Sequence, residues 1–196
     1  SLYVFVVARL CARAARTPVI GTYHNTRENY HPTMRVLERL TRPMSAVDIG
    51  VSKDVERSYA GSARLYDGSN TPVGGRSTYT IYNGIDVEAF AKQVHEAAGE
   101  PVPGLPAGAN PVYLTVGRYA PEKNQAALVR AMADVVEAYP SAHLLLVGWG
   151  PLADHLRAVA RDSGVADHVT VTGQVPSVEP YYAVADAFVL PSHTEG

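Results

Sequence analysis

The 196-residue sequence contains one cysteine, Cys11, so no internal disulfide can form. A secreted disulfide scaffold is therefore not indicated, and the compartment we expect is the reducing cytoplasm. Seventeen lysines and arginines nearly cancel nineteen aspartates and glutamates, so the overall charge gives no basic field that would hold nucleic acid or an anionic membrane. The opening apolar stretch, 2–7, is far shorter than the roughly 20 residues of a membrane span. We expect neither a nucleic-acid partner nor a transmembrane helix.

The two ends of the sequence indicate a fragment. It begins without methionine and stops soon after an apolar segment, 187–190, so we expect a protein cut at both ends. The opening residues have helical spacing, and the stripe that we expect to face a core is Leu2, Val6, Leu10 and Ala14. Such a helix implies a preceding strand that this chain lacks.

Short apolar runs alternate with helical spacing in the first half of the chain. The predicted strands are 19–23, 47–52 and 79–82, and the predicted helices are 33–42, with Met34, Leu37 and Leu40 inward, and 53–59, capped by Ser52. Residues 61–75 have the composition of a loop. Between 99 and 111, repeated glycine and proline exclude a helix or a central strand and indicate a connecting segment.

The second half repeats the alternation more regularly. The predicted strands are 112–116, 143–147, 169–172 and 187–190, and the predicted helices are 124–139, 152–163 and 181–184. Strands alternating with helices through short loops indicate parallel βαβ units, so the fold class is α/β in both halves. Our division of the chain is 1–86, a connecting segment 87–110, and 111–196. Ligands in such sheets bind at the carboxyl ends of the strands.

The turn after the strand 112–116 contains Gly117, Arg118 and Lys123 and leads into a helix. Two cations beside a helix N-terminus can form an anion site, because the free backbone N–H groups and the helix dipole add to their charge. The alternative is ordinary surface charge, with Lys123 beside Glu122.

Gly148 and Gly150 follow the next strand in a pattern that also occurs in dinucleotide-binding proteins. A nicotinamide site is disfavoured, because the acid expected at the end of the following strand is absent and Asp167 precedes that strand. The glycines either let backbone approach a ligand or simply turn the chain.

Three further groups are weaker candidates. His193 and Glu195 follow the last apolar segment and could bind a polyol, although an ordinary hydrophilic loop explains them equally well. His24 follows the first strand, where a surface role is more common than a catalytic one. Two acidic residues, Asp86 and Glu88, lie on either side of Val87. They fit the start of a helix better than a metal site, and no metal-ligand pattern is present.

Taken together, these segments resemble the family 4 glycosyltransferases of the GT-B fold. The segments that carry the resemblance are Gly117-Arg118, Glu122-Lys123-Asn124, Leu144 to Gly148 with Gly150-Pro151, Val169 with Gly173 and Val175, Tyr182, Ala185 to Ser192, Glu195-Gly196, and Asn83 to Asp86 upstream. The resemblance covers the chain from Val19 onward and implies two Rossmann-like parallel-sheet domains, both incomplete here.

The resemblance also implies roles for individual residues. The donor would be a nucleotide-diphosphate sugar, a UDP- or GDP-sugar, with no other cofactor and no metal. The implied catalytic residues are His24, Arg118, Lys123 and Glu195, and the implied donor-binding residues are Gly117, Arg118, Lys123, Gly148, Gly150, Val175 and Glu195. Arg118 and Lys123 would contact the diphosphate, Glu195 the donor sugar and His24 the transferred sugar. A second family glutamate would lie beyond Gly196.

The reaction implied is transfer of a hexose to an acceptor hydroxyl with retention of anomeric configuration. The acceptor would be a glycan, a lipid-linked compound or a small molecule, and the missing N-terminal part leaves open a peripheral contact with the inner face of the membrane. The alternatives are a nucleotide-sugar-binding module without turnover and a nucleotide-sugar epimerase of the same fold. We expect the 196-residue chain alone to be inactive.

Overall fold

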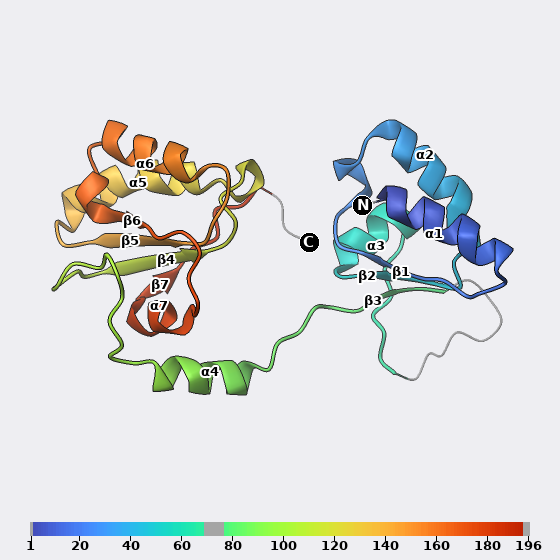
Figure 1. The fold of residues 1–196 in the computed structure, drawn as a ribbon, viewed down its shortest axis with the longest axis horizontal. Coiled ribbons are helices and arrows are strands. Elements are labelled where there is room, and N and C mark those ends of the chain that lie inside the picture. Colours follow the sequence, from blue (N-terminus) through green and yellow to red (C-terminus); the bar gives the residue numbers. More distant parts are fainter. Residues whose placement is uncertain (1, 69–76, 194–196) are drawn as a thin grey trace. The chain divides into compact units, whose positions relative to one another are not determined.

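The computed structural model describes residues 2–68 and 77–193. These residues form two compact units, which divide between Gly84 and Ile85. Each unit contains a parallel β-sheet with helices packed on it (Figure 1), as the α/β prediction requires. Within the described residues, no helix combines the length and the apolar character needed to cross a bilayer.

The first unit has a three-stranded parallel sheet in the order β1-β2-β3. Its strands are β1 (Ile20–Tyr23), β2 (Val47–Gly50) and β3 (Ser77–Thr80), and its helices are α1 (Leu2–Ala14), α2 (Pro32–Thr41) and α3 (Lys53–Ala60). Helices α1 and α2 pack side by side (Figure 1). Ser52 caps α3 as predicted, because its side chain accepts a hydrogen bond from the backbone N–H of Val55 at 3.2 Å.

The inward faces of α1 and α2 differ from the predicted stripes. Leu2 and Val6 are buried, but Leu10 is 49 % exposed and Arg9 takes the inward position. Ala14 is exposed as well.

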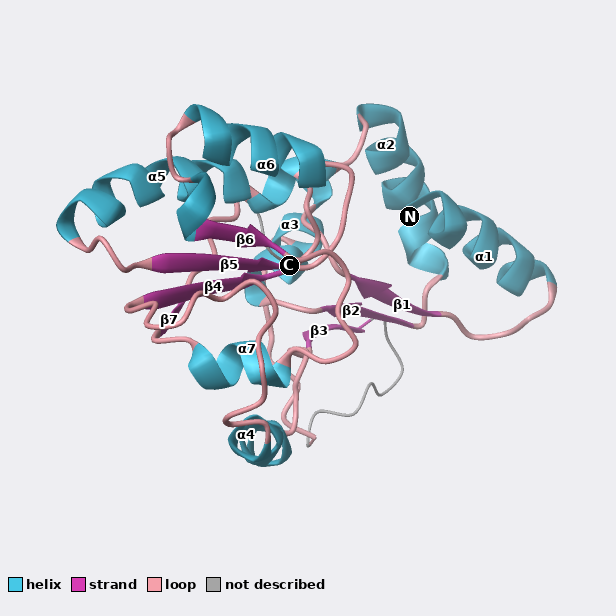
Figure 2. Cartoon of the chain, turned by 60° about the vertical axis from the view of Figure 1, so that its left-hand side comes forward, coloured by secondary structure: helices cyan, strands magenta, loops and turns pink. Residues whose placement is uncertain are grey.

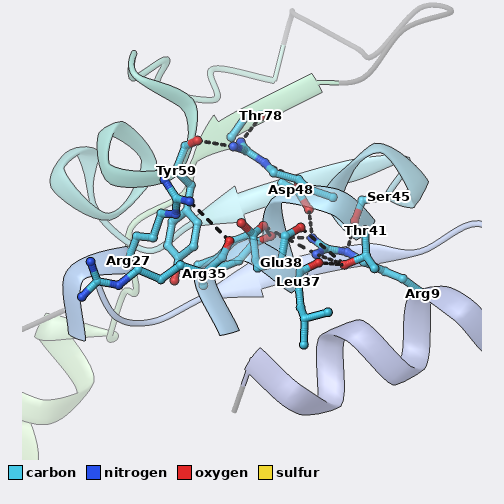
Figure 3. A network of polar contacts seen from close by, with 12 residues as sticks. Arg9, Arg27, Arg35, Leu37, Glu38, Thr41, Ser45, Asp48, Tyr59 and Thr78 are labelled. Carbon is cyan, nitrogen blue, oxygen red and sulfur yellow. Dashed lines mark hydrogen bonds and ion pairs between the residues drawn. The ribbon is translucent and has the colours of Figure 1, made fainter. Parts of the chain in front are cut away.

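On α2, Met34 is partly buried, but Leu37 and Leu40 are exposed, and Glu38 and Thr41 face inward. The reason is a buried polar network that joins the two helices to the sheet (Figure 3). Arg9 Nη2 lies 3.2 Å from Asp48 Oδ1, and Arg9 Nη1 lies 3.5 Å from Glu38 Oε1. Apolar spacing alone does not reveal charged residues that find buried partners.

The second unit has a four-stranded parallel sheet in the order β6-β5-β4-β7. Its strands are β4 (Val112–Val116), β5 (His143–Val147), β6 (Val169–Val171) and β7 (Ala187–Phe188). Helices α5 (Gln125–Ala138) and α6 (Ala153–Asp162) cover one face, and α7 (Glu179–Val184) covers the other (Figure 2). The central strand β5 is buried along its whole length, which explains the continuous apolar run 144–147 that follows His143.

The segment 87–110, predicted as a connection, contributes a helix to the second unit. Helix α4 (Val87–Glu96) packs against α7, and the rings of Phe90 and Tyr182 meet edge to face with centroids 5.3 Å apart. Asp86 caps α4, since its carboxylate accepts the N–H of Ala89 at 2.9 Å. The interpretation of the acidic residues here as helix-start charge is therefore confirmed.

Candidate active site

The strand order of the second unit defines one position in the sheet where a ligand is expected. The chain runs from β4 outward through β5 to β6, and it then returns to add β7 on the opposite side of β4. The connections after β4 and β7 therefore leave the sheet at a switch in strand order. In open parallel sheets, ligands bind beside the carboxyl ends of the strands at such a switch.

The connection after β4 carries the two predicted cations. Arg118 Nη2 lies 2.5 Å from Glu122 Oε1, and both side chains are substantially exposed. The pKa of Glu122 is lowered first by a hydrogen bond from its own backbone N–H and second by the bond from Arg118. Lys123 ends the short 3-10 turn η3 (Pro121–Lys123) and is partly buried. Glu122, the carboxylate beside Lys123 in the surface-charge alternative, thus forms an ion pair with Arg118.

The loop after β7 packs onto this turn. Asn124 adopts a left-handed conformation with φ of 53°, and its side-chain Nδ2 donates to the carbonyl of Pro191 at 3.1 Å. The backbone N–H of His193 donates to the carbonyl of Glu122 at 2.9 Å. Two segments that lie about 70 residues apart and were singled out separately therefore meet, as the strand order requires.

Two buried polar atoms at this junction were not anticipated. Gln125 donates through Nε2 to the carbonyl of Arg118 at 2.9 Å, but its Oε1 is buried and finds no partner in the described part of the chain. Ser192 Oγ is likewise buried without a partner among those residues. Buried polar atoms are nearly always hydrogen-bonded, so each of these two atoms needs a partner that the described residues do not supply. A glutamine at a helix start gives no signal of this in the sequence.

The structure explains why two of the residues after β5 are glycines. Gly148 and Gly150 have φ of 145° and 156°, and a Cβ on either would lie within 2.4 Å of a backbone oxygen of the loop after β4. The two loops are bonded directly, because the N–H of Tyr119 donates to the carbonyl of Trp149 at 2.9 Å. The glycines thus fix the position of the Arg118 turn, and their own contact with donor stays a prediction.

The remaining predicted residues lie in different settings. Val175 is partly buried and packs against the apolar cluster around Leu114 and Tyr181. Gly117 is the first residue after β4, with open space where a Cβ would lie. Glu195 lies outside the described residues. In the first unit, His24 is exposed and is the first residue after β1, at the carboxyl edge of that sheet.

Comparison with known proteins matches residues 110–196 to the family described as "Glycosyl transferases group 1". The sequence is 41 % identical over 91 residues to a GDP-mannose-dependent alpha-(1-6)-phosphatidylinositol monomannoside mannosyltransferase of Mycobacterium tuberculosis, covering 45 % of this chain and 24 % of that protein. It is 30 % identical over 191 residues to a phosphatidyl-myo-inositol mannosyltransferase of the same species, covering 95 % of this chain and 45 % of the relative. The chain belongs to the group 1 glycosyltransferases.

The fold agrees with this membership. The structure of Anabaena HepE in complex with UDP and glucose superposes with a TM-score of 0.74 at 20 % identity, and the match covers 99 % of this chain and 51 % of that one. This glycosyltransferase chain therefore has the α/β architecture of about half of a GT-B structure. It spans about half the length, or less, of the curated relatives it matches.

Proposed function

We propose that the protein containing this chain transfers a hexose from a nucleotide-diphosphate sugar to an acceptor hydroxyl with retention of anomeric configuration. The observation that carries the proposal is the junction of the β4 and β7 loops, which gathers Arg118, Lys123 and two unpartnered buried oxygens at the switch in strand order. GDP-mannose and a phosphatidylinositol-type lipid are the first donor and acceptor to test, because the relatives' names specify them. A lipid acceptor would place the protein at a membrane surface.

Each residue has a defined role in this proposal. Arg118 and Lys123 bind the diphosphate, and pairing with Glu122 engages only Nη2 of Arg118, which leaves other guanidinium N–H groups for phosphate oxygens. Gly117, Gly148, Gly150 and Val175 would line the donor through their backbone. Glu195 would bind the hydroxyls of the donor sugar, and His24 of the first unit would lie near the transferred sugar.

The chemical step needs no further reactant. The bond between the anomeric carbon and the leaving diphosphate oxygen breaks, and a bond from that carbon to the acceptor oxygen forms on the same face. The acceptor proton passes to the departing phosphate, which leaves as the nucleoside diphosphate. Negative charge grows on that phosphate in the transition state, so the cations Arg118 and Lys123 stabilise it.

Substitution of Lys123 tests the site directly. In the full-length protein, Lys123→Ala should lower turnover by roughly tenfold or more, because one electrostatic contact to the developing charge is lost. Release of nucleoside diphosphate is measured with GDP-mannose, and with UDP- and ADP-sugars, in the presence and absence of a lipid acceptor extract. Arg130→Ala, at an exposed arginine on α5, is the matched control. Unchanged turnover of Lys123→Ala at saturating donor would contradict the assignment.

The same assay separates the alternatives. A binding module would bind nucleotide but release no diphosphate with any acceptor. An epimerase would convert the donor sugar without an acceptor. Transfer that depends on both donor and acceptor supports the proposal.

A further inference from the structure

A cavity in the first unit has four arginines among its lining residues and belongs to no site described above. It has a volume of about 580 Å³ and is bordered by α2, α3 and the turns next to them. The charged and phenolic residues that line it are Arg27, Glu38, Arg39, Arg42, Arg57 and Tyr59. The volume falls within the range of roughly 300–1,000 Å³ that is usual for small-molecule sites.

The arginines of this cavity differ in how far their hydrogen-bonding capacity is used. Arg42 is structural, because it bonds Asp48 Oδ2 at 3.1 Å, Thr78 Oγ1 at 3.2 Å and the carbonyl of Tyr59. Arg57 forms only an exposed ion pair with Asp54, a type of contact that contributes little. Arg39 is exposed and makes no hydrogen bond or ion pair with any described residue. Arg39 and most of the Arg57 guanidinium are therefore available to a ligand.

Two buried donors in the cavity wall have no partner in the described part of the chain. They are Nε of Arg27 and the hydroxyl of Tyr59. Arg27 uses Nη2 for the carbonyl of Arg35 at 3.3 Å, which holds its guanidinium in place. Burial raises the pKa of Tyr59, so its phenol stays protonated and remains a donor. Leaving such donors unpaired costs free energy that a bound acceptor would recover.

The carboxylate in the cavity wall does not cancel this positive charge. Glu38 receives the hydroxyl hydrogen bond of Tyr23 at 2.7 Å and lies 3.5 Å from Arg9 Nη1. Figure 3 shows Glu38 between Arg9 on one side and the group of Arg27 and Tyr59 on the other. Its charge is thus compensated from the buried side. Four arginines and one carboxylate, that of Glu38, line the cavity. With their ion-pair partners Arg9, Asp48 and Asp54 included, the group has five positive and three negative side chains, so the balance is positive.

We propose that this cavity binds the phosphoryl group of a phosphate ester. Guanidinium N–H groups and a phenol hydroxyl all donate hydrogen bonds. Several such donors together can bind the several oxygens of a phosphate. The ester is either a free compound or the headgroup of a phospholipid. None of the residues that line the cavity is a proposed donor contact, and occupancy of the cavity requires no sugar transfer.

Phosphate affinity of the full-length protein tests the site. All measurements are made in a Lys123→Ala background, so that the proposed donor site contributes little binding. Inorganic phosphate should bind by calorimetry, and Arg39→Gln and Tyr59→Phe should each weaken it roughly tenfold, as expected for loss of one hydrogen bond to a charged group. Arg13→Gln, at an exposed arginine of α1 outside the cavity, should have no effect.

A second arm identifies the source of the phosphate. Cosedimentation with phosphatidylcholine vesicles, with and without phosphatidylinositol, measures binding to a lipid headgroup. Binding that needs phosphatidylinositol and falls in Arg39→Gln assigns the cavity to a headgroup, and variant-sensitive binding of inorganic phosphate alone assigns it to a free ester.

Equal binding by Arg39→Gln, Tyr59→Phe and the parent protein in both arms, or no binding in either, overturns the proposal. Arg39 is exposed and pairs with no described residue, so its variant should keep the parent melting temperature. Both arms measure binding. Their result therefore holds even if the full-length protein transfers no sugar.

Discussion

Arg9 is a charged residue that lies in the interior of the first unit, where an apolar residue is expected. Its side chain is fully buried, with Nε donating to Ser45 Oγ at 2.8 Å and Nη2 lying 3.2 Å from Asp48 Oδ1. Its guanidinium carbon also lies 5.5 Å from the centroid of the Phe5 ring. A buried charge persists only when it is paired and hydrogen-bonded. The polar partners of Arg9 lie in β1, α2 and β2 and in the turn at Ser45, so no local pattern around Arg9 could predict its burial.

His143 is a buried histidine whose protonation should influence stability. It is 3 % exposed and its Nε2 lies 2.8 Å from Thr170 Oγ1. Burial first, and the charge of His168 second, lower the pKa of His143. The folded state therefore binds fewer protons than the unfolded state at acid pH, so this contribution to stability is complete above about pH 6.5 and is lost as the pH falls below it.

Urea titrations of the full-length protein at pH 7.5 and 5.5 test this expectation, with Trp149 fluorescence reporting on the second unit. The free energy of unfolding should fall at pH 5.5, by at most about 1.4 kcal/mol for each unit of displacement of the His143 pKa. His143→Gln should reduce the difference between the two pH values, and His155→Gln, at an exposed histidine of α6, should not. An equal pH effect in His143→Gln and the parent would refute the role of His143.

At the scale of elements, the loops after β4 and β5 behave as one structure. A Cβ on Gly150 would lie 2.4 Å from the carbonyl oxygen and 2.7 Å from the nitrogen of Tyr119. Both contacts are to backbone, which cannot move without shifting the Arg118 turn. Gly150→Ala should therefore lower the free energy of unfolding by about 1–3 kcal/mol, from the strained φ together with the clash, and should also weaken donor binding.

Gly164→Ala is the matched control for that variant. Gly164 also has a positive φ, of 70°, but no atom lies within 4 Å of the position of its Cβ. Gly150→Ala should therefore be the more destabilised of the two in urea titration, and only Gly150→Ala should lose affinity for GDP. Equal effects of the two substitutions would mean that the contact between the loops is not what requires Gly150.

The elements that the sequence predicted well are those with a continuous local signal. Strand β5 is buried on both faces, so every residue of 143–147 lies in a buried environment. The faces of α1 and α2 were predicted only in part: Leu2 and Val6 are buried as expected, but Arg9 and Glu38 are inward for reasons that lie in other elements. Strand β7 ends at Phe188 rather than at residue 190, since only Ala187 and Phe188 pair with β4.

In the candidate site, too, the features with a local sequence pattern were predictable, and the features that depend on distant segments were not. The turn from Gly117 to Lys123 was predictable, because cations beside a strand end and a helix start form a local pattern. The bond from Asn124 to Pro191 and the unpartnered oxygen of Gln125 were not, since they depend on β4 and β7 being neighbours in the sheet.

At the scale of the whole molecule, the proposed machinery is divided between the two units. Arg118 and Lys123 belong to the second unit, and His24 belongs to the first, at the carboxyl end of β1. A residue that acts on the transferred sugar should affect the reaction without affecting the affinity for the nucleotide, because the proposed diphosphate contacts are residues of the other unit.

His24→Ala in the full-length protein should therefore lower sugar transfer by about a hundredfold, the order expected when one transition-state contact is lost. The affinity for GDP, measured by calorimetry, should stay within about twofold of the parent value, because His24 is proposed to contact the transferred sugar and not the nucleotide. His31→Ala, at an exposed histidine of the same unit, is the matched control. If GDP affinity falls as far as transfer does, His24 supports the structure of the protein rather than the reacting sugar, and the division of roles between the two units is incorrect.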